Sequence, residues 1–152
     1  MNINRLIKEA HDNAIEKGFY ECPECLGKGK VNCGCSEEPD IMECPECNGT
    51  RIDQNKNIPG MLMLVITEIS EAVEALRKNK HADYNEDAVV ETYTNCSTWF
   101  EEHYKDTFED EIADVFIRLF DLCGYMNIDI EKHIKAKMEY NKTRPKKHNK
   151  EF

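Results

Sequence analysis

Two pairs of acidic residues stand at helical spacing in this chain, each beside an apolar stripe. Glu68 and Glu71 lie in the segment LVITEISEAVEALR, and Glu111 and Asp114 lie in TFEDEIADVFIRLFDL. Residues three apart share one face of a helix, so each pair presents two carboxylates on one side. If the two helices meet, four carboxylates converge and repel one another. A hard divalent cation relieves this repulsion, and Mg²⁺ is the expected ion.

The simpler interpretation of these acids is a solvated acidic face. The chain has 30 Asp and Glu against 20 Lys and Arg, a formal net charge of −10, so one such pair alone is weak evidence of a site. Two pairs on successive helices with apolar flanks favour a metal site. The negative charge also argues against nucleic acid as a partner, because no net positive field would attract a phosphate backbone.

A second group of reactive side chains comes from two Cys-Pro-Glu-Cys motifs. They place Cys22, Cys25, Cys44 and Cys47 at the spacing of a structural zinc site. Two such turns supply four thiolates, which complete a tetrahedron around one Zn²⁺. The alternative is a set of free thiols or a redox pair, and two spaced motifs favour zinc over it.

The glycines that follow each motif extend this interpretation. CPECLGKG resembles the CxxCxGxG repeats of DnaJ-type zinc domains fully, and CPECNGT resembles them in part. Cys33 and Cys35 lie between the motifs, either as spare ligands or as the remnant of a second pair, and are left outside the zinc site. Cys96 and Cys123 are expected to be ordinary helix residues, since a lone buried cysteine behaves as a small apolar side chain.

The elements that would position these residues are helices. Apolar periodicity predicts four of them, at 3–17, 60–79, 98–126 and 129–143. The second has an apolar stripe expected to face the core, made of Leu62, Val65, Ile66, Ile69, Val73 and Leu76. A short helical piece is predicted near residues 86–91. The expected fold class is all-α, one helical domain over 1–152 with an inserted zinc-binding lobe at 19–57.

The predicted fourth helix carries a polar stripe. Lys137, Asn141 and Arg144 stand at i, i+4 and i+7. Lys and Arg suit phosphate oxygens, and Asn can hydrogen-bond a sugar or a base, which indicates a substrate-binding face. The alternative is a basic face near a helix C-terminus, which the helix dipole favours without any ligand.

At these residues the chain resembles the MazG-like family of all-α nucleoside triphosphate pyrophosphohydrolases. The similarity lies in MLMLVITEISEAVEALRK, FEDEIADVFIRLFDLCGYMNIDIEKHI and KMEYNKTRPKKHNKEF, and covers most of the chain outside residues 22–57 and 80–97. It implies a four-helix bundle, with the family's ExxE and ExxD metal site on the two acidic pairs and its phosphate-contacting helix on the stripe of Lys137. It also implies a homodimer or homotetramer with sites near subunit interfaces.

The activity that the resemblance implies is Mg²⁺-dependent cleavage of a (d)NTP to the (d)NMP and pyrophosphate, with nucleotide-pool house-cleaning as a role. Mg²⁺ held by the four carboxylates would offset charge and lower the pKa of the attacking water. Glu71 and Glu68 are the expected catalytic residues, and Glu71 is favoured as the base. The preferred nucleotide is open. Phe19, Tyr20 and Trp99 are candidates for stacking on its base and equally for the core.

A different class of function is a catalytically inactive zinc-knuckle adaptor. It would bind protein or nucleic acid through the lobe and the basic tail, which contains Lys142, Arg144, Lys146, Lys147, His148 and Lys150. An adaptor has no need of four acids on facing helices, so the carboxylates favour the enzyme. A thiol-redox protein would need a single CxxC in a βαβ context, which the sequence lacks.

The cellular setting follows from what the sequence does not contain. No segment approaches the ~20 apolar residues that span a bilayer, and residues 1–19 do not form a signal peptide. We therefore expect no membrane contact and a cytoplasmic location, where structural disulfides are rare. The lobe is expected to close a long connection near the mouth of the carboxylate site, with zinc in a structural role.

Overall fold

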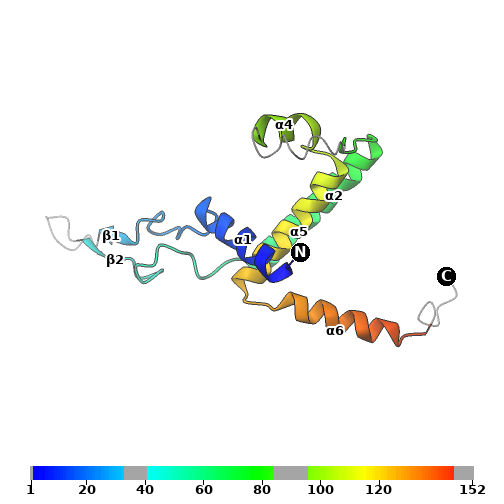
Figure 1. Cartoon of the computed structure of the whole chain (residues 1–152). Helices are drawn as coiled ribbons and strands as arrows, with labels where there is room; N and C mark the ends of the chain where they lie inside the picture. Colours follow the sequence, from blue (N-terminus) through cyan, green and yellow to red (C-terminus); the bar gives the residue numbers. More distant parts are fainter. Residues whose placement is uncertain (1, 33–40, 84–95, 146–152) are drawn as a thin grey trace.

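The computed structural model describes residues 2–32, 41–83 and 96–145. These residues form helices and one small sheet in the order α1 (Ile3–Glu16), β1 (Lys30–Asn32), β2 (Ile41–Glu43), α2 (Ile58–Arg77), α4 (Cys96–His103), α5 (Phe108–Tyr125) and α6 (Ile130–Lys142). The mostly helical character that the sequence predicts is confirmed (Figure 1). None of the helices in these ranges is both long and apolar enough to cross a membrane.

Three of the predicted helices are confirmed as α1, α2 and α6, with ends shifted by at most two residues. Several predicted features lie outside the described residues: Cys33, Cys35, the helical piece near 86–91, and the tail residues Lys146, Lys147, His148 and Lys150. The side chain of Cys96, the first residue of α4, is outside them as well. Cys123 is buried in α5, and burial raises the pKa of its thiol, in agreement with the expected apolar role.

The centre of the molecule is the pair of α2 and α5, which lie side by side (Figure 1). The apolar residues buried in the two helices are Val65, Ala72 and Ala75 of α2, and Leu122 and Cys123 of α5, and the acids Glu68 and Glu111 are buried with them. Small residues let the two helix axes approach closely, which brings the polar residues at the edges of the contact near one another. The pairing therefore positions the acids of α2 opposite those of α5.

The predicted apolar stripe of α2 is mostly not buried, and this part of the prediction is wrong for a single chain. Only Val65 of the stripe turns toward α5. The other five residues are between 43% and 52% exposed: Leu62, Ile66, Ile69, Val73 and Leu76. The reason is that α2 is apolar on two adjacent faces, and α5 covers the one that carries the alanines.

The predicted helix at 98–126 is wrong as a single element, because the chain turns between α4 and α5. Asp106 has a positive φ of 56°, which a helix interior does not allow. Thr107 then caps α5, since its side chain accepts a hydrogen bond from the Asp110 N–H at 3.3 Å. A Thr at the N-cap with an acidic residue three positions on is a helix-start signal, and it outweighs the apolar periodicity here.

α1 packs across α5 near the end of that helix. A Cβ atom at Gly124 would lie 2.6 Å from the Cβ of His11, so a glycine is required for this approach. α6 follows α5 and packs chiefly against α1, and no residue of α6 is buried. Because α6 extends away from the α2–α5 pair, the four-helix bundle stays a prediction (Figure 1).

The cysteine lobe is inserted between α1 and α2. Its strands β1 and β2 pair antiparallel, with Val31 opposite Met42, and an isolated bridge joins Glu21 to Ile52. The lobe projects from the end of the α2–α5 pair opposite α4 (Figure 1). A two-stranded sheet of this size is marginal by itself, so other contacts must stabilise the lobe.

Candidate functional site

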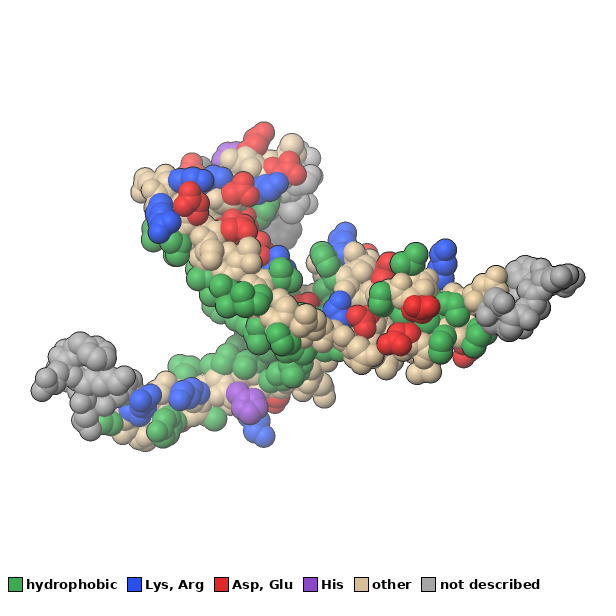
Figure 2. All heavy atoms as spheres, turned by 180° about the vertical axis from the view of Figure 1, so that it is seen from behind, with side chains coloured by type: hydrophobic (Ala, Val, Ile, Leu, Met, Phe, Trp, Pro, Cys, Tyr) green, Lys and Arg blue, Asp and Glu red, His purple; other side chains and the backbone are tan. Residues whose placement is uncertain are grey.

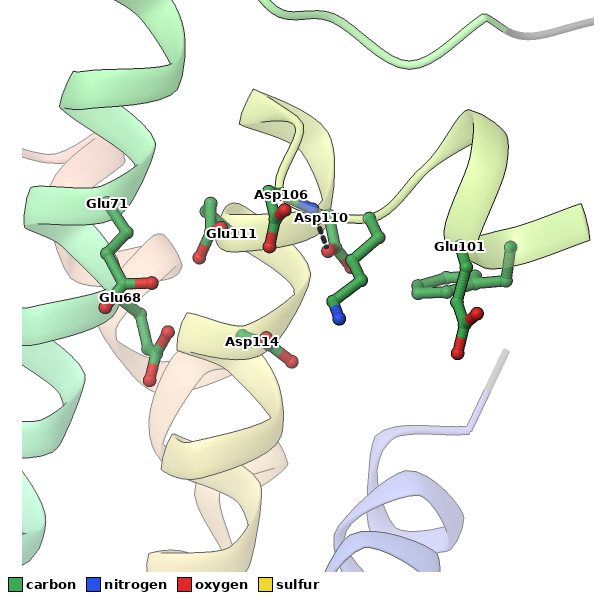
Figure 3. A pocket seen from close by; sticks show the side chains of 9 residues that line it. Glu68, Glu71, Glu101, Asp106, Asp110, Glu111 and Asp114 are labelled. Atoms are coloured by element: carbon green, nitrogen blue, oxygen red, sulfur yellow. Dashed lines mark hydrogen bonds between the residues drawn. The ribbon is translucent and has the colours of Figure 1, made fainter. Parts of the chain in front are cut away.

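The two acidic pairs converge between α2 and α5. Carboxylate oxygens of Glu68, Glu71 and Glu111 all lie within 4.8 Å of one another, a spacing that could hold a metal ion. Asp114 lines the same pocket one turn further along α5 but is outside this close group. Figure 3 shows the acids of α2 facing those of α5. We refer to Glu68, Glu71, Glu111 and Asp114 as the acidic cluster.

Burial differs strongly within the acidic cluster. Glu68 and Glu111 are 5% and 6% exposed, whereas Glu71 is exposed to solvent. Burial raises the pKa of Glu111, and the charges of its acidic neighbours, Glu71 first, raise it further. Burial, followed by the charge of Asp110, likewise raises the pKa of Asp114. The cluster therefore disfavours its own negative charge and would be stabilised by a cation.

One cation is already present and was missed by the sequence analysis. Arg118, one turn beyond Asp114 on α5, donates from Nε to Glu68 Oε1. Among the described residues, no donor reaches the carboxylate of Glu111. The residue is only 6% exposed, and its carboxylate oxygens retain contact with solvent. The sequence signal for Arg118 is its i, i+4 spacing from Asp114, and this spacing by itself indicates only an ordinary surface ion pair.

Two recesses flank the acidic cluster. The first has a volume of about 380 Å³, and α4 and the turn after it contribute Phe100, Glu101, Lys105 and Asp106 to its lining. The second has a volume of about 300 Å³ and is bounded by the end of α2 and by the residues that follow it. Both volumes are at the lower end of the range for small-molecule sites.

The turn after α4 is held in place by hydrogen bonds. The N–H groups of Tyr104 and Lys105 both donate to the carbonyl of Phe100, at 2.9 and 3.0 Å. The Asp106 N–H donates to Asp110 Oδ2 at 2.9 Å, the contact drawn as a dashed line in Figure 3. These bonds fix α4 beside the acids, which the prediction of one continuous helix could not have anticipated.

The predicted substrate-binding stripe is formed but lies elsewhere. Lys137, Asn141 and Arg144 are on α6 and its C-terminal turn, and none of them lines either recess. Lys137 Nζ and the Arg144 guanidinium instead lie 5.1 and 5.9 Å from the ring centroid of Tyr140. Within one chain the stripe does not reach the acidic cluster, so its role in substrate binding stays a prediction.

The four cysteines of the two motifs form a second site. Their residues are 4% exposed or less, and their sulfur atoms all lie within 4.8 Å of one another. Cys22 Sγ is 3.9 Å from Cys44 Sγ, and Cys25 Sγ is 3.8 Å from Cys47 Sγ. A tetrahedron of Zn–S bonds of about 2.3 Å separates its sulfurs by about 3.8 Å, so the thiols fit a metal ion such as zinc.

The backbone of the two motifs is nearly repeated. In the first, the Gly27 N–H donates to the Cys22 carbonyl at 3.4 Å, and in the second the Gly49 N–H donates to the Cys44 carbonyl at 3.3 Å. Gly29 has a φ of 75°, and a Cβ atom there would lie 2.8 Å from the Gly49 carbonyl oxygen. The motifs therefore fold as paired turns, whose glycines allow their close contact.

An anchor of polar and aromatic side chains joins this lobe to the helices. Tyr20 is 2% exposed and donates from its hydroxyl to Asp121 Oδ1 at 2.8 Å, and His11 Nδ1 lies 2.8 Å from the same oxygen. Tyr125 donates from its hydroxyl to the Gln54 carbonyl at 2.8 Å. Tyr20 therefore holds the lobe in place and is not free to stack on a base.

The lobe is distant from the acidic cluster in the same chain. Its anchor on Asp121 and Tyr125 is near the C-terminal end of α5, whereas Glu111 and Asp114 are near the N-terminal end. Within one chain the lobe therefore does not lie at the mouth of the carboxylate site, and its place relative to the site of another subunit stays a prediction. The connection from the lobe enters α2 at its first turn, and the acids of α2 are in its second half.

Comparisons with protein-family models, with curated proteins and with solved structures give no significant match to this chain. The MazG-like resemblance and the activity that it implies therefore stay predictions. The geometry of the two sites is the basis on which a function can be argued.

Proposed function

We propose that the protein is a Mg²⁺-dependent nucleoside triphosphate pyrophosphohydrolase that converts a (d)NTP to the (d)NMP and pyrophosphate. The observation that carries the proposal is the convergence of Glu68, Glu71 and Glu111, and in the described part of the chain no hydrogen-bond donor reaches the carboxylate of Glu111. Carboxylate oxygens are the ligands that Mg²⁺ prefers, so the donor set fits this ion. The motifs shared with the MazG-like family supply the identity of the substrate, and a role in nucleotide-pool house-cleaning follows from it.

The side chains divide the work of the proposed reaction. Bound Mg²⁺ would offset the charge of the phosphates and lower the pKa of the attacking water. Arg118 keeps Glu68 oriented toward the metal position through its hydrogen bond. Glu71 is the solvent-accessible member of the close group, which favours it over Glu68 as the base. It takes the proton as the water oxygen bonds to the α-phosphorus and the bond to the bridging oxygen breaks.

Zn²⁺ is the ion we propose for the cysteine lobe, in a structural role. In the described part of the lobe the four cysteines form the buried cluster, and only Val31 packs partly against them. A unit with so little apolar core needs a metal to stay folded. Four thiolates in a closed tetrahedron leave no open position for a substrate, which favours structure over catalysis. A reduced thiol site also agrees with the expected cytoplasmic location.

Self-association into a homodimer or homotetramer is part of the proposal. The exposed stripe of α2 repeats at alternating spacings of four and three: Leu62, Ile66, Ile69, Val73 and Leu76. This is the heptad pattern of helices that pack against partner helices. Figure 2 shows hydrophobic side chains gathered along the central helices.

The adaptor function remains the alternative. The exposed apolar residues of the lobe and its neighbouring turn favour it, among them Phe19, Leu26 and Ile41. It leaves unexplained why Glu111 lies beside two further carboxylates, whose charges raise its pKa, when Arg118 is bonded to Glu68. The enzyme therefore accounts for more of the structure.

Pyrophosphate release tests the proposal. The full chain is incubated with a panel of NTPs and dNTPs, with Mg²⁺ or with EDTA. We expect Mg²⁺-dependent release that falls by about 100-fold or more in Glu71→Gln, the range for loss of a general base. Glu9→Gln, an exposed acid of α1, is the matched control and should retain wild-type release. A folded, Mg²⁺-loaded wild type that releases no pyrophosphate from any nucleotide would favour the adaptor.

A further inference from the structure

The two recesses beside the acidic cluster differ in charge and in apolar character. Seven carboxylates, one lysine and the ring of Phe100 line the first, whereas four carboxylates, two lysines and an alanine line the second. Glu71, Asp106 and Glu111 line both. A ligand that contacts these shared residues can therefore extend into both recesses at once.

The aromatic wall of the first recess is held rigidly on α4. Phe100 is 40% exposed and stacks on Tyr104, with ring centroids 5.9 Å apart and an interplanar angle of 12°. Trp99, the residue before it, stacks on His103 at 4.7 Å and 6°. Phe100 is thus supported on one side and partly open on the other. An exposed aromatic ring of this kind binds a nucleobase by stacking, whatever the base.

The second recess is better suited to phosphates. Lys78 Nζ lies 3.2 Å from a carboxylate oxygen of Glu74, and Lys80 Nζ lies 3.5 Å from one of Asp106. Both pairs are exposed and therefore weak, so phosphate oxygens can replace the carboxylates. The first recess offers only Lys105 among its seven carboxylates, and it repels a terminal phosphate more strongly.

We propose that a nucleoside triphosphate lies across the acidic cluster, with its base on Phe100 in the first recess and its β- and γ-phosphates beside Lys78 and Lys80 in the second. This orientation rests on the proposed function. The α-phosphate then lies at Glu71 and Glu111, the junction of the two recesses. The Glu111 side chain, 6% exposed, accepts no hydrogen bond within the described ranges and lines both recesses, which marks this junction as a ligand contact.

The orientation explains why the triphosphate of the substrate would be cleaved between its α- and β-phosphates. Water beside Glu71 reaches the α-phosphorus, and the leaving pyrophosphate is already in the second recess. Phe100 contributes no group that recognises one base in particular, so the inference also predicts that bases are discriminated only weakly. Phe100 and the two lysines act by positioning and binding the substrate.

Calorimetry with two ligands separates the nucleoside end from the phosphate end. The full chain with Mg²⁺ is titrated with a non-hydrolysable α,β-methylene nucleoside triphosphate and, separately, with inorganic triphosphate. Phe100→Leu is expected to weaken binding of the nucleotide about tenfold and to leave inorganic triphosphate unchanged. Lys80→Gln is expected to weaken binding of both about tenfold. Lys17→Gln, an exposed lysine at the end of α1, is the control and should change neither.

Trp99 provides a second readout, because it is the single tryptophan of the sequence and precedes Phe100. Its fluorescence is expected to change with the nucleotide and not with inorganic triphosphate. The inference is overturned if Phe100→Leu leaves the dissociation constant of the nucleotide unchanged. It is also overturned if Lys105→Gln, rather than Lys80→Gln, weakens inorganic triphosphate, since the orientation would then be reversed.

These outcomes are distinct from those for the proposed function. If the wild type binds both ligands and the variants weaken binding as expected, but no pyrophosphate is released, the proposed orientation is supported and the proposed function is contradicted. If the wild type releases pyrophosphate but Phe100→Leu binds nucleotide normally, the proposed function is supported and the proposed orientation is contradicted. Circular dichroism of each variant verifies that α4 and the other helices remain folded.

Discussion

Glu111 is the residue on which the candidate site depends most. Its side chain is 6% exposed and lies beside Glu68 and Glu71, and within the described ranges the cation that contacts this group is Arg118, through Glu68. A buried carboxylate without a partner destabilises the folded protein unless it is protonated or bound to a cation. A cation at this site would therefore relieve the repulsion between the carboxylates, independent of any resemblance to an enzyme family.

The raised pKa of Glu111 gives a pH dependence with a defined sign. Between the ordinary carboxyl pKa of 4.5 and the raised value, the folded protein binds more protons than the unfolded protein. The free energy of unfolding of the metal-free protein therefore falls as the pH rises through this window. We expect the Tm in EDTA to decrease from about pH 5 toward neutral pH, and Glu111→Gln to reduce that decrease. Thermal unfolding followed by circular dichroism measures it.

Mg²⁺ and a matched variant test the assignment of this pH dependence. Because Mg²⁺ binds the ionised carboxylates, it should raise the Tm more at neutral pH than at about pH 5. Glu9→Gln should retain the wild-type decrease, since Glu9 is exposed on α1. Equal decreases in Glu111→Gln and in Glu9→Gln would mean that another group is responsible.

At the scale of elements, the turn between α4 and α5 and the insertion of the lobe have the largest consequences. Thr107 starts a new helix, so the chain turns after α4, and Phe100 and Lys105 line the first recess. The lobe, by contrast, is anchored through Tyr20 and Asp121 at the far end of α5. α4 and the lobe thus lie at opposite ends of the α2–α5 pair.

Zinc removal should unfold the lobe and spare the helices. Cys22→Ser removes one of the four thiolates, so we expect loss of bound zinc and loss of amide protection in the lobe, because the cysteines are its buried cluster. Pyrophosphate release per folded molecule should stay within about twofold, since the lobe and the acidic cluster are far apart. Zinc analysis, hydrogen exchange and pyrophosphate assays measure these effects.

Cys123→Ala is the matched control for the zinc experiment. Cys123 is buried in α5 and has no part in the group of four thiols, so this variant should retain zinc. Retention of one zinc ion by Cys22→Ser would contradict the ligand assignment. A large loss of turnover in a folded, zinc-free variant would mean that the lobe acts on the site after all.

For the whole molecule, the main feature is apolar surface that one chain does not cover. The exposed stripe of α2 lies beside the face that packs on α5, and Phe116 and Ile117 of α5 are 53% and 49% exposed. Contiguous apolar surface of this kind is rare on monomers and marks an interface. α6 packs against α1 but has no buried residue, so most of its surface is uncovered within the described part of the chain.

Ile69→Asp should disrupt self-association. Ile69 is central in the exposed stripe, and a carboxylate buried at a helix–helix interface is strongly unfavourable. We expect wild type to be dimeric or tetrameric, and the dissociation constant of the variant to be at least about tenfold higher. Analytical ultracentrifugation over a range of concentrations measures it. Thr67→Asp, on an exposed face of α2 away from the stripe, should leave the assembly intact, and a monomeric wild type would contradict the proposal.

The candidate site could be predicted from the sequence only in part. The positions of Glu68, Glu71 and Glu111 on facing helices followed from i, i+3 spacing beside apolar residues, and Cys22 and its three partners followed from their motifs. Arg118 and Phe100 could not be found in this way. Their roles depend on how α5 and α4 are placed against α2, and no local spacing encodes that placement.

The sequence by itself determined the helical segments, the four thiols of the lobe and the acidic pairs, because these depend on local periodicity and motif spacing. Only the tertiary structure decided which apolar face of α2 is buried, since Val65 and Ala72 offer α5 a closer approach than Leu62 and Ile69 do. It also decided that residues of α4 line a recess beside the acids, that the lobe lies at the opposite end of α5, and that α6 extends outward. Each of these outcomes depends on contacts between residues far apart in the chain. Several apolar helix faces can form such contacts, and the local sequence does not decide which of them pack together.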